Sequence, residues 1–259
     1  LNEQISSVVS DTKLIVSGDS WTAGTSATRE DGRPQWLDDR TKTVNFDISI
    51  TWPYHLGKML DMEVINVGLG GTGNEFIYNT MIDTLCQEKN VGLAICCWSK
   101  FQRTDFNYKT DDHFGCRTLT INQPDFCDYP NKKIAERVKP FVESYDKLNL
   151  YSDEWNLVKS LRWFNAFQNF CENENIPYCQ VSAITTIPFE LLNYLIDLPV
   201  FYKINSSTFL GWPISEKIGG WNLENKLITE ELRVSKDDTH PNTEGHKKIA
   251  KYIYDIIYD

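Results

Sequence analysis

Hydrophobic residues in this chain occur in short runs that alternate with stretches of helical spacing. The runs are short and apolar, and turn-forming residues follow several of them, a pattern typical of buried strands. They predict strands at residues 13–17, 64–67, 93–97 and 178–183. The stretches with helical spacing predict helices at residues 52–60, 74–86 and 243–258, and a further long helix that Ser152 caps. Strands that alternate with helices indicate an α/β fold, in which a parallel sheet is covered on both sides.

Two stretches do not follow this alternation. Residues 100–150 are rich in Asp, Asn, Tyr and Phe, and residues 198–233 carry two tryptophans and several glycines. They are either insertions over the carboxyl ends of the sheet, where α/β proteins bind ligands, or surface loops. No repeat or linker divides the 259 residues, so we expect residues 1–259 to form a single domain.

The charge balance restricts the classes of partner. The chain has 36 acidic against 26 basic residues and a formal net charge of −10, which disfavours nucleic acids and anionic membranes because both carry negative charge. No hydrophobic stretch reaches the length of a membrane span, and the first residues lack the features of a signal peptide. We therefore expect a soluble, cytoplasmic protein, and seven cysteines without C-x-x-C spacing also favour a reducing compartment.

A glycine-rich stretch follows the second predicted strand. Gly68, Gly70 and Gly73 match the G-x-G-x-x-G fingerprint of dinucleotide-binding proteins. That fingerprint also needs an acidic residue about twenty positions later, at the end of the next strand, to bind the ribose. Here the first acidic residue after that strand is Asp105. Lys100 and Arg103 in the same loop suit a 2′-phosphate, so NADP binding stays an alternative, but the fingerprint lacks its confirming residue.

A serine lies just beyond the carboxyl end of the first predicted strand, where the sequence Gly-Asp-Ser ends at Ser20. A serine hydroxyl becomes a strong nucleophile only beside a base that a third group orients. Asp237 and His240 offer such a pair near the end of the chain, because one turn brings a carboxylate against an imidazole at that spacing. Each residue alone is more typical of a cap or a surface position, but together they indicate a Ser-His-Asp triad.

Three motifs in this order resemble the SGNH/GDSL hydrolase superfamily: Gly18-Asp19-Ser20, Asn66-Val67-Gly68-Leu69-Gly70-Gly71-Thr72 and Asp237-Asp238-Thr239-His240-Pro241. The resemblance implies a three-layer α/β/α sandwich with a central parallel sheet, the flavodoxin-like architecture. It assigns the nucleophile to Ser20, the base to His240 and, by the family's D-x-x-H spacing, the acid to Asp237. It also implies that the N–H groups of Ser20 and Gly71 bind the oxyanion, and that no cofactor or metal takes part.

One family motif is absent. The family usually has Gly-x-Asn-Asp after the third strand, and its asparagine side chain donates to the oxyanion, whereas residues 97–103 contain no asparagine. Lys100, the adjacent Ser99 and Asn74 from the glycine-rich turn are candidates to replace it. We include Asn74 in the predicted oxyanion hole beside the two backbone donors. The loss of one such donor typically costs about 10²–10³ in rate.

The sequence thus predicts a serine esterase that hydrolyses a small-acyl ester, preferably an acetyl ester, through an acyl-serine intermediate. The resemblance implies small esters or acetylated carbohydrates as substrates. Aromatic side chains near a polar pocket would suit a sugar ring, and four tryptophans neighbour the predicted site: Trp21, Trp98, Trp212 and Trp221. The main alternative is a slow or inactive protein of the same fold that binds carbohydrate.

Overall fold

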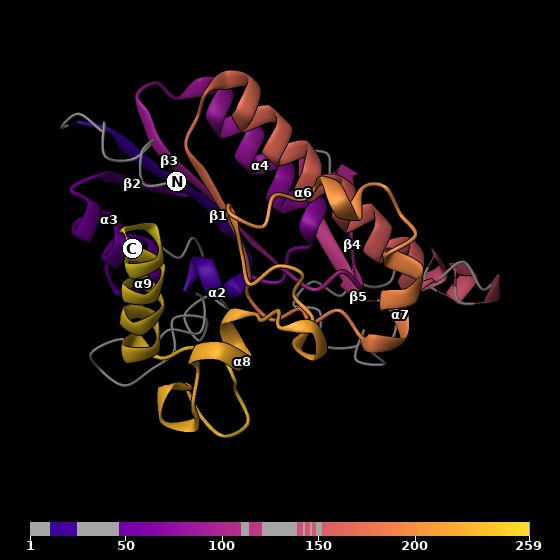
Figure 1. Ribbon diagram of the computed structural model, residues 1–259. Coiled ribbons are helices and arrows are strands. Elements are labelled where there is room, and N and C mark those ends of the chain that lie inside the picture. Colours follow the sequence, from indigo (N-terminus) through magenta and orange to yellow (C-terminus); the bar gives the residue numbers. More distant parts are fainter. Residues whose placement is uncertain are drawn as a thin grey trace.

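The structure, a computed structural model, describes residues 11–24, 47–109, 114–120, 139–141, 143–145, 147–148 and 152–258. At its centre is a parallel sheet whose strands, within the described residues, follow the order β2-β1-β3-β6-β7 (Figure 1). The strands are β1 (Lys13–Gly18), β2 (Glu63–Asn66), β3 (Val91–Trp98), β6 (Tyr178–Ser182) and β7 (Phe209–Leu210). Helices cover both faces of this sheet, so the predicted α/β fold is confirmed.

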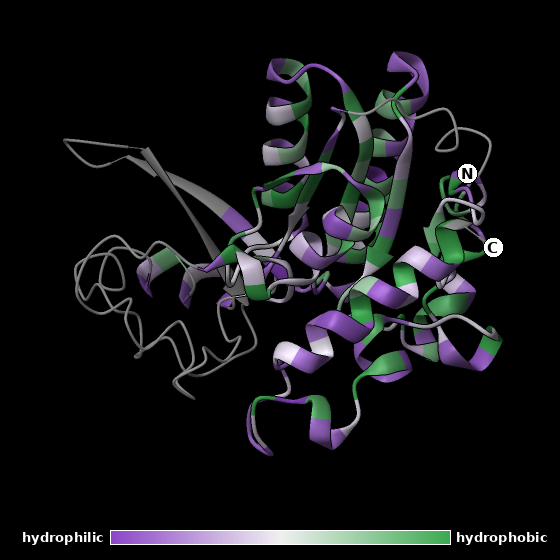
Figure 2. Cartoon of the chain, turned by 90° about the vertical axis from the view of Figure 1, so that its left-hand side faces the viewer, coloured by the Kyte–Doolittle hydropathy of each residue, from purple (hydrophilic) through white to green (hydrophobic). Residues whose placement is uncertain are grey.

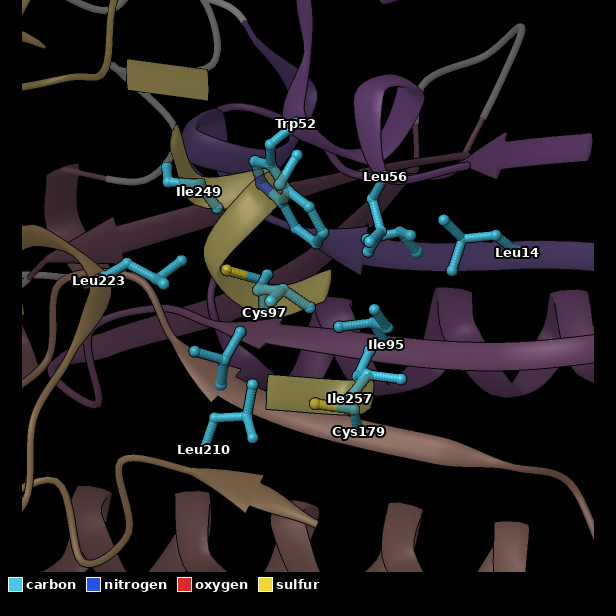
Figure 3. Packing of buried hydrophobic residues seen from close by; sticks show 14 of the residues in the cluster. Leu14, Trp52, Leu56, Ile95, Cys97, Cys179, Leu210, Leu223, Ile249 and Ile257 are labelled. Atoms are coloured by element: carbon cyan, nitrogen blue, oxygen red, sulfur yellow. The ribbon is translucent and has the colours of Figure 1, made fainter. Parts of the chain in front are cut away.

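The central strands send alternate side chains to opposite faces of the sheet. In β1, Leu14 and Val16 join the hydrophobic core on one face, whereas Ile15 joins the core on the other. The same alternation separates the neighbouring Cys96 and Cys97 of β3, which are both buried free thiols. Figure 3 shows Leu14 and Cys97 in the first of these cores, together with side chains from the covering helices. Strands that are buried on both faces need apolar residues at successive positions, which explains the continuous hydrophobic runs.

Two pairs of helices form the outer layers. Helices α3 (Trp52–Leu60) and α9 (Thr243–Tyr258) pack together on one face, and α4 (Asn74–Gln87) and α6 (Asp153–Glu174) cover the other (Figure 1). The bands of green and purple along these helices in Figure 2 show hydrophobic and hydrophilic residues within each helix. As predicted, Ser152 caps α6, since its hydroxyl accepts the Trp155 N–H at 3.2 Å. None of the described helices combines the length and the apolar character needed to cross a bilayer.

The remaining described elements are short and were not predicted. They are α2 (Ser20–Ala23), α7 (Phe189–Leu195), α8 (Leu223–Leu227), η2 (Ile48–Ile50), η4 (Phe201–Lys203), η5 (Glu216–Ile218), η6 (Glu230–Leu232) and the antiparallel strands β4 (Arg103–Lys109) and β5 (Phe114–Thr120). Within residues 198–233, β7 extends the main sheet by pairing with β6. Much of the predicted insertion at residues 100–150 lies outside the described residues, and its placement over the sheet stays a prediction.

The strand order brings the sequence motifs to one edge of the sheet. Because β1 lies between β2 and β3, the order of the strands reverses beside β1, and open α/β sheets bind ligands at such a point, outside the carboxyl ends of the strands. Ser20 follows β1, the glycine-rich turn follows β2, and Ser99 follows β3. Residues that are far apart in the sequence therefore meet at this edge.

Candidate active site

The Ser20 hydroxyl is presented by a tight turn between β1 and α2. Asp19 caps α2, because its Oδ1 accepts the Trp21 N–H at 3.0 Å. Gly18 provides the space for the turn, since a Cβ at this position would lie 2.1 Å from the hydroxyl oxygen of Thr22. In the Gly-Asp-Ser motif, the glycine thus allows close packing against Thr22, the aspartate caps α2, and the serine places its hydroxyl at the edge of the sheet.

His240 lies within hydrogen-bonding distance of Ser20, although 220 positions separate them in the sequence. Its Nε2 is 2.7 Å from Ser20 Oγ, and on the other side of the ring Nδ1 is 2.6 Å from Oδ1 of Asp238. The structure therefore brings Ser20 and His240 together. The carboxylate against the imidazole, however, is that of Asp238 and not that of Asp237, which corrects the acid assigned from the D-x-x-H spacing.

A compact turn explains why Asp238 takes this place. Its Oδ1 also accepts the backbone N–H of His240 at 3.1 Å, an arrangement that aspartate side chains commonly form with the residue two positions later. The Ser235 N–H donates to Asp238 O at 3.2 Å, and the Asp238 N–H donates to Ser235 Oγ at 3.1 Å. One carboxylate oxygen thus holds both the backbone and the ring of His240.

The three side chains differ in exposure to solvent. Ser20 is 9% exposed, whereas the side chains of His240 and Asp238 are 30% and 27% exposed. Trp21 is buried beside the imidazole, and the centroids of the two rings are 6.1 Å apart. The imidazole can therefore exchange protons with solvent while its position is fixed by Asp238 and by packing.

A second histidine is buried near the site. Burial, reinforced by the neighbouring His55 and His240, lowers the pKa of His246 from 6.5 to about 3. Its Nδ1 accepts the Trp52 N–H at 3.2 Å, which requires an unprotonated nitrogen. A neutral His246 therefore places no positive charge beside His240.

Folding stability is expected to decrease below pH 6.5 because of His246. The unfolded chain binds a proton at this residue near pH 6.5, but the folded chain does so only near pH 3, so acid favours the unfolded state. Each pH unit in this interval removes about 1.4 kcal/mol from the free energy of unfolding. Urea unfolding at pH 7 and pH 5 measures the change, and the variant His246→Gln should lose about 2 kcal/mol less than the wild type over this interval. Equal losses in the two proteins would contradict the prediction.

The glycine-rich turn after β2 lies beside the nucleophile turn, since the Leu69 N–H donates to Gly18 O at 2.9 Å. Gly71 is exposed and has a φ of +80°, a conformation that glycine adopts without strain. Within the described part of the chain, no group accepts the N–H of Gly71 or that of Ser20. Both N–H groups are therefore free to bind an oxygen atom of a ligand.

Comparison with known proteins identifies the fold. No protein-family model and no curated protein sequence matches the chain, but solved structures do. A lipolytic protein of the G-D-S-L family from Desulfitobacterium hafniense matches with a TM-score of 0.44 and 14% identity, over 95% of this chain and 99% of that one. The esterase EstA from Pseudoalteromonas sp. matches with a TM-score of 0.44 and 15% identity, over 95% and 97%. TesA matches with a TM-score of 0.50 and 12% identity, over 95% and 98%. The chain therefore shares the overall fold of TesA.

Asn74, the predicted replacement for the absent motif asparagine, bonds to groups within the protein. Asn74 is buried, its Oδ1 accepts the Ser99 N–H at 2.8 Å, and its Nδ2 donates to Ser160 Oγ at 3.0 Å. It therefore ties α4 to the end of β3 and to α6, and its predicted role as an oxyanion donor is not supported by this geometry. Ser99 is also engaged, because its hydroxyl donates to Asp19 Oδ2 at 2.6 Å, and Lys100 is exposed.

Replacing Asn74 with alanine is expected to affect stability more than chemistry. The substitution leaves the buried Ser99 N–H without its acceptor and removes one of the two hydrogen bonds of the Ser160 hydroxyl, which costs about 1–3 kcal/mol of the free energy of unfolding. Ester turnover per folded molecule should fall by less than about tenfold, whereas an oxyanion donor would cost about 10²–10³. Urea unfolding and initial rates on p-nitrophenyl acetate measure both effects, with the exposed Asn79→Ala on the same helix as the control. A hundredfold loss of turnover with unchanged stability would restore Asn74 to the oxyanion hole.

Sequence analysis missed the role of Arg103, which contacts both turns of the candidate active site. Its Nη1 donates to Asp19 Oδ2 at 2.9 Å and to Thr72 O at 2.9 Å. The Asp19 side chain is fully buried, and a buried carboxylate needs such a partner. This guanidinium is thus engaged inside the protein, which does not support its use for a 2′-phosphate. The sequence signal for this role was Asp19 of the Gly-Asp-Ser motif, because an acid that is expected to be buried needs a basic partner.

Two of the four tryptophans that neighbour the predicted site cannot contact a sugar ring. Trp21 and Trp98 are 1% and 0% exposed, so neither can offer a face to a ligand. Trp212 stacks against Phe209 at 5.2 Å between ring centroids. Trp21 and Trp98 therefore contribute packing to the core and not a surface for a sugar ring.

Proposed function

We propose that this chain is a serine esterase that hydrolyses a small-acyl ester. The observation that carries the proposal is the continuous series of hydrogen bonds from Asp238 through His240 to Ser20, with distances of 2.6 and 2.7 Å. A serine hydroxyl with a base in contact, and a carboxylate that orients the base, is the arrangement that activates serine for acyl transfer. The nucleophile, base and orienting acid thus have Ser20, His240 and Asp238 as their candidates.

The reaction proceeds in two stages. Ser20 Oγ attacks the ester carbonyl carbon while His240 Nε2 takes the hydroxyl proton, and His240 then gives this proton to the departing alcohol as the ester bond breaks. Water attacks the resulting acyl-serine, with its proton again passing to His240, and Ser20 leaves with that proton as the carboxylic acid is released. Asp238 accepts the Nδ1–H throughout and stabilises the positive charge on the ring.

Two backbone groups are proposed to stabilise the oxyanion. The N–H groups of Ser20 and Gly71 are free within the described residues, and donors aimed at the developing negative charge supply much of the rate in acyl transfer. Neither group requires a metal or a nucleotide. The resemblance of the sequence to SGNH/GDSL hydrolases supports an acetyl ester, with a carbohydrate as the alcohol.

A second candidate is a protein of the same fold that binds carbohydrate and turns over slowly or not at all. Two of the candidates for the third oxyanion donor favour it, because the Asn74 amide donates to Ser160 and the Ser99 hydroxyl donates to Asp19. This candidate predicts glycan binding that persists in a Ser20→Ala variant and no covalent intermediate.

The decisive experiment is covalent labelling of the nucleophile. The protein is treated with a fluorophosphonate, which reacts only with activated serines, and the adduct is located by peptide mass spectrometry while p-nitrophenyl acetate and an acetylated xylo-oligosaccharide serve as substrates. The proposal expects one adduct, at Ser20, and acetate release from both substrates that the label abolishes. Binding of the oligosaccharide without adduct or acetate release would favour the second candidate.

A further inference from the structure

Two side chains of β4 hold one peptide group of the glycine-rich turn. Arg103 Nη1 donates to the carbonyl oxygen of Thr72 at 2.9 Å, and the N–H of Gly73 donates to Asp105 Oδ1 at 2.8 Å. This carbonyl and this N–H belong to the same peptide group, between Thr72 and Gly73. Arg103 and Asp105 can reach it together because residues two apart on a strand point to the same side.

The contact between strand and turn is close. A Cβ at Gly73 would lie 2.7 Å from Asp105 Oδ2 and 3.1 Å from Arg103 Cβ. Asp105 Oδ2 also accepts the Phe76 N–H at 2.8 Å, so this carboxylate caps the start of α4, which has no cap from its own Gly73. β4 and α4 thus pack against each other (Figure 1), with the turn held between them.

The same arginine also reaches the nucleophile turn. Nη1 of Arg103 is 2.9 Å from Oδ2 of Asp19, and Asp19 directly precedes Ser20. The other oxygen of Asp19 accepts the Trp21 N–H and so fixes the start of α2. One guanidinium nitrogen therefore connects the turn that carries Ser20 to the turn that carries Gly71.

We propose that Arg103 and Asp105 form a clamp that positions the two backbone donors of the oxyanion hole. This proposal rests on the proposed esterase function. Gly71 is exposed and a Cβ on it would meet no atom within 4 Å, so its own packing does not fix its position. The peptide group between Thr72 and Gly73, one residue further along the turn, is held at both ends. Arg103 and Asp105 are positioning residues: they act through the turn and do not contact the reacting atoms.

The expected effect of loosening the clamp is a loss of turnover without a loss of substrate binding. Misplacement of a reacting group by about 1 Å can cost about 10² in rate, so Arg103→Met and Asp105→Asn should each lower kcat by about 10- to 100-fold, with KM changed less than about threefold. Arg103→Lys keeps the positive charge beside the buried Asp19 but lacks the planar fork of arginine, so an intermediate loss is expected, and this variant serves if Arg103→Met does not fold. Because both side chains hold one peptide group, the double variant Arg103→Lys with Asp105→Asn should lose less than the product of the single losses.

The test compares these variants with wild type, Ser20→Ala and the control Arg162→Met, which removes an exposed arginine on α6. Excess fluorophosphonate first counts the reactive Ser20 sites, and turnover of p-nitrophenyl acetate is expressed per reactive site, so that partial unfolding does not count as lost activity. The rate of labelling by fluorophosphonate is measured separately. The clamp is supported if kcat and the labelling rate fall together in the Arg103 and Asp105 variants and stay unchanged in Arg162→Met. Suppose that wild type hydrolyses the ester and Ser20→Ala does not, but that the Arg103 and Asp105 variants keep the wild-type kcat per reactive site. The clamp is then overturned and the esterase function stands. If wild type shows no turnover that depends on Ser20, the esterase function fails, and the clamp fails with it.

Discussion

Ester hydrolysis is expected to disappear when Ser20 is replaced by alanine, with kcat falling by about 10⁴–10⁶ or to the uncatalysed background. The reason is that alanine offers no nucleophile to the carbonyl carbon, and His240 then has no hydroxyl proton to accept. Release of p-nitrophenol from p-nitrophenyl acetate measures the loss directly. The effect on folding should be small, because the Ser20 hydroxyl makes a hydrogen bond to His240 and to no other described side chain.

A matched control separates this loss from a general effect of removing a hydroxyl. Ser207 is an exposed turn residue whose hydroxyl, among the described residues, bonds to Asn205 Oδ1 alone, so Ser207→Ala should keep wild-type turnover. Thermal unfolding of both variants should stay close to that of the wild type. If Ser20→Ala hydrolysed the ester as fast as Ser207→Ala, Ser20 would be a turn residue and the proposed mechanism would be wrong.

The layers of the fold were predictable because the strands are buried on both faces. A strand in this position must be apolar throughout, and the covering helices must be apolar on one side, so sequence pattern and structure agree at β1, β3, β6 and α6. β7 was not predictable, because it has two residues, Phe209 and Leu210, and forms only by pairing with β6. A strand of two residues leaves no recognisable pattern in the sequence, because it is defined by its hydrogen bonds to a neighbouring strand.

The candidate site was predictable where a role requires one residue type at a fixed place. Ser20 and His240 are such cases, and the structure brings them together. The acid was not, because Asp237 and Asp238 are adjacent and equal in chemistry, and only the turn that bonds Asp238 to the His240 N–H distinguishes them. Arg103 was not predictable either, since its contacts to Asp19 and Thr72 join segments that are far apart in the sequence.

The two adjacent aspartates allow the second large effect to be tested with a nearly identical control. Asp238→Asn is expected to lower kcat by about 10²–10⁴, because a neutral amide no longer stabilises the positive charge that forms on the His240 ring during the reaction. The asparagine keeps an oxygen for the backbone N–H of His240, so the turn should stay folded. Initial rates on p-nitrophenyl acetate at saturating substrate measure the change.

Asp237→Asn removes the same charge one residue away and should change kcat by less than about threefold, because the carboxylate that bonds His240 Nδ1 is that of Asp238. Since both substitutions alter the net charge equally, the difference between them isolates the hydrogen bond from the general electrostatic field. A large loss in Asp237→Asn together with a small one in Asp238→Asn would show that the D-x-x-H spacing, and not the turn around Asp238, identifies the acid that orients His240.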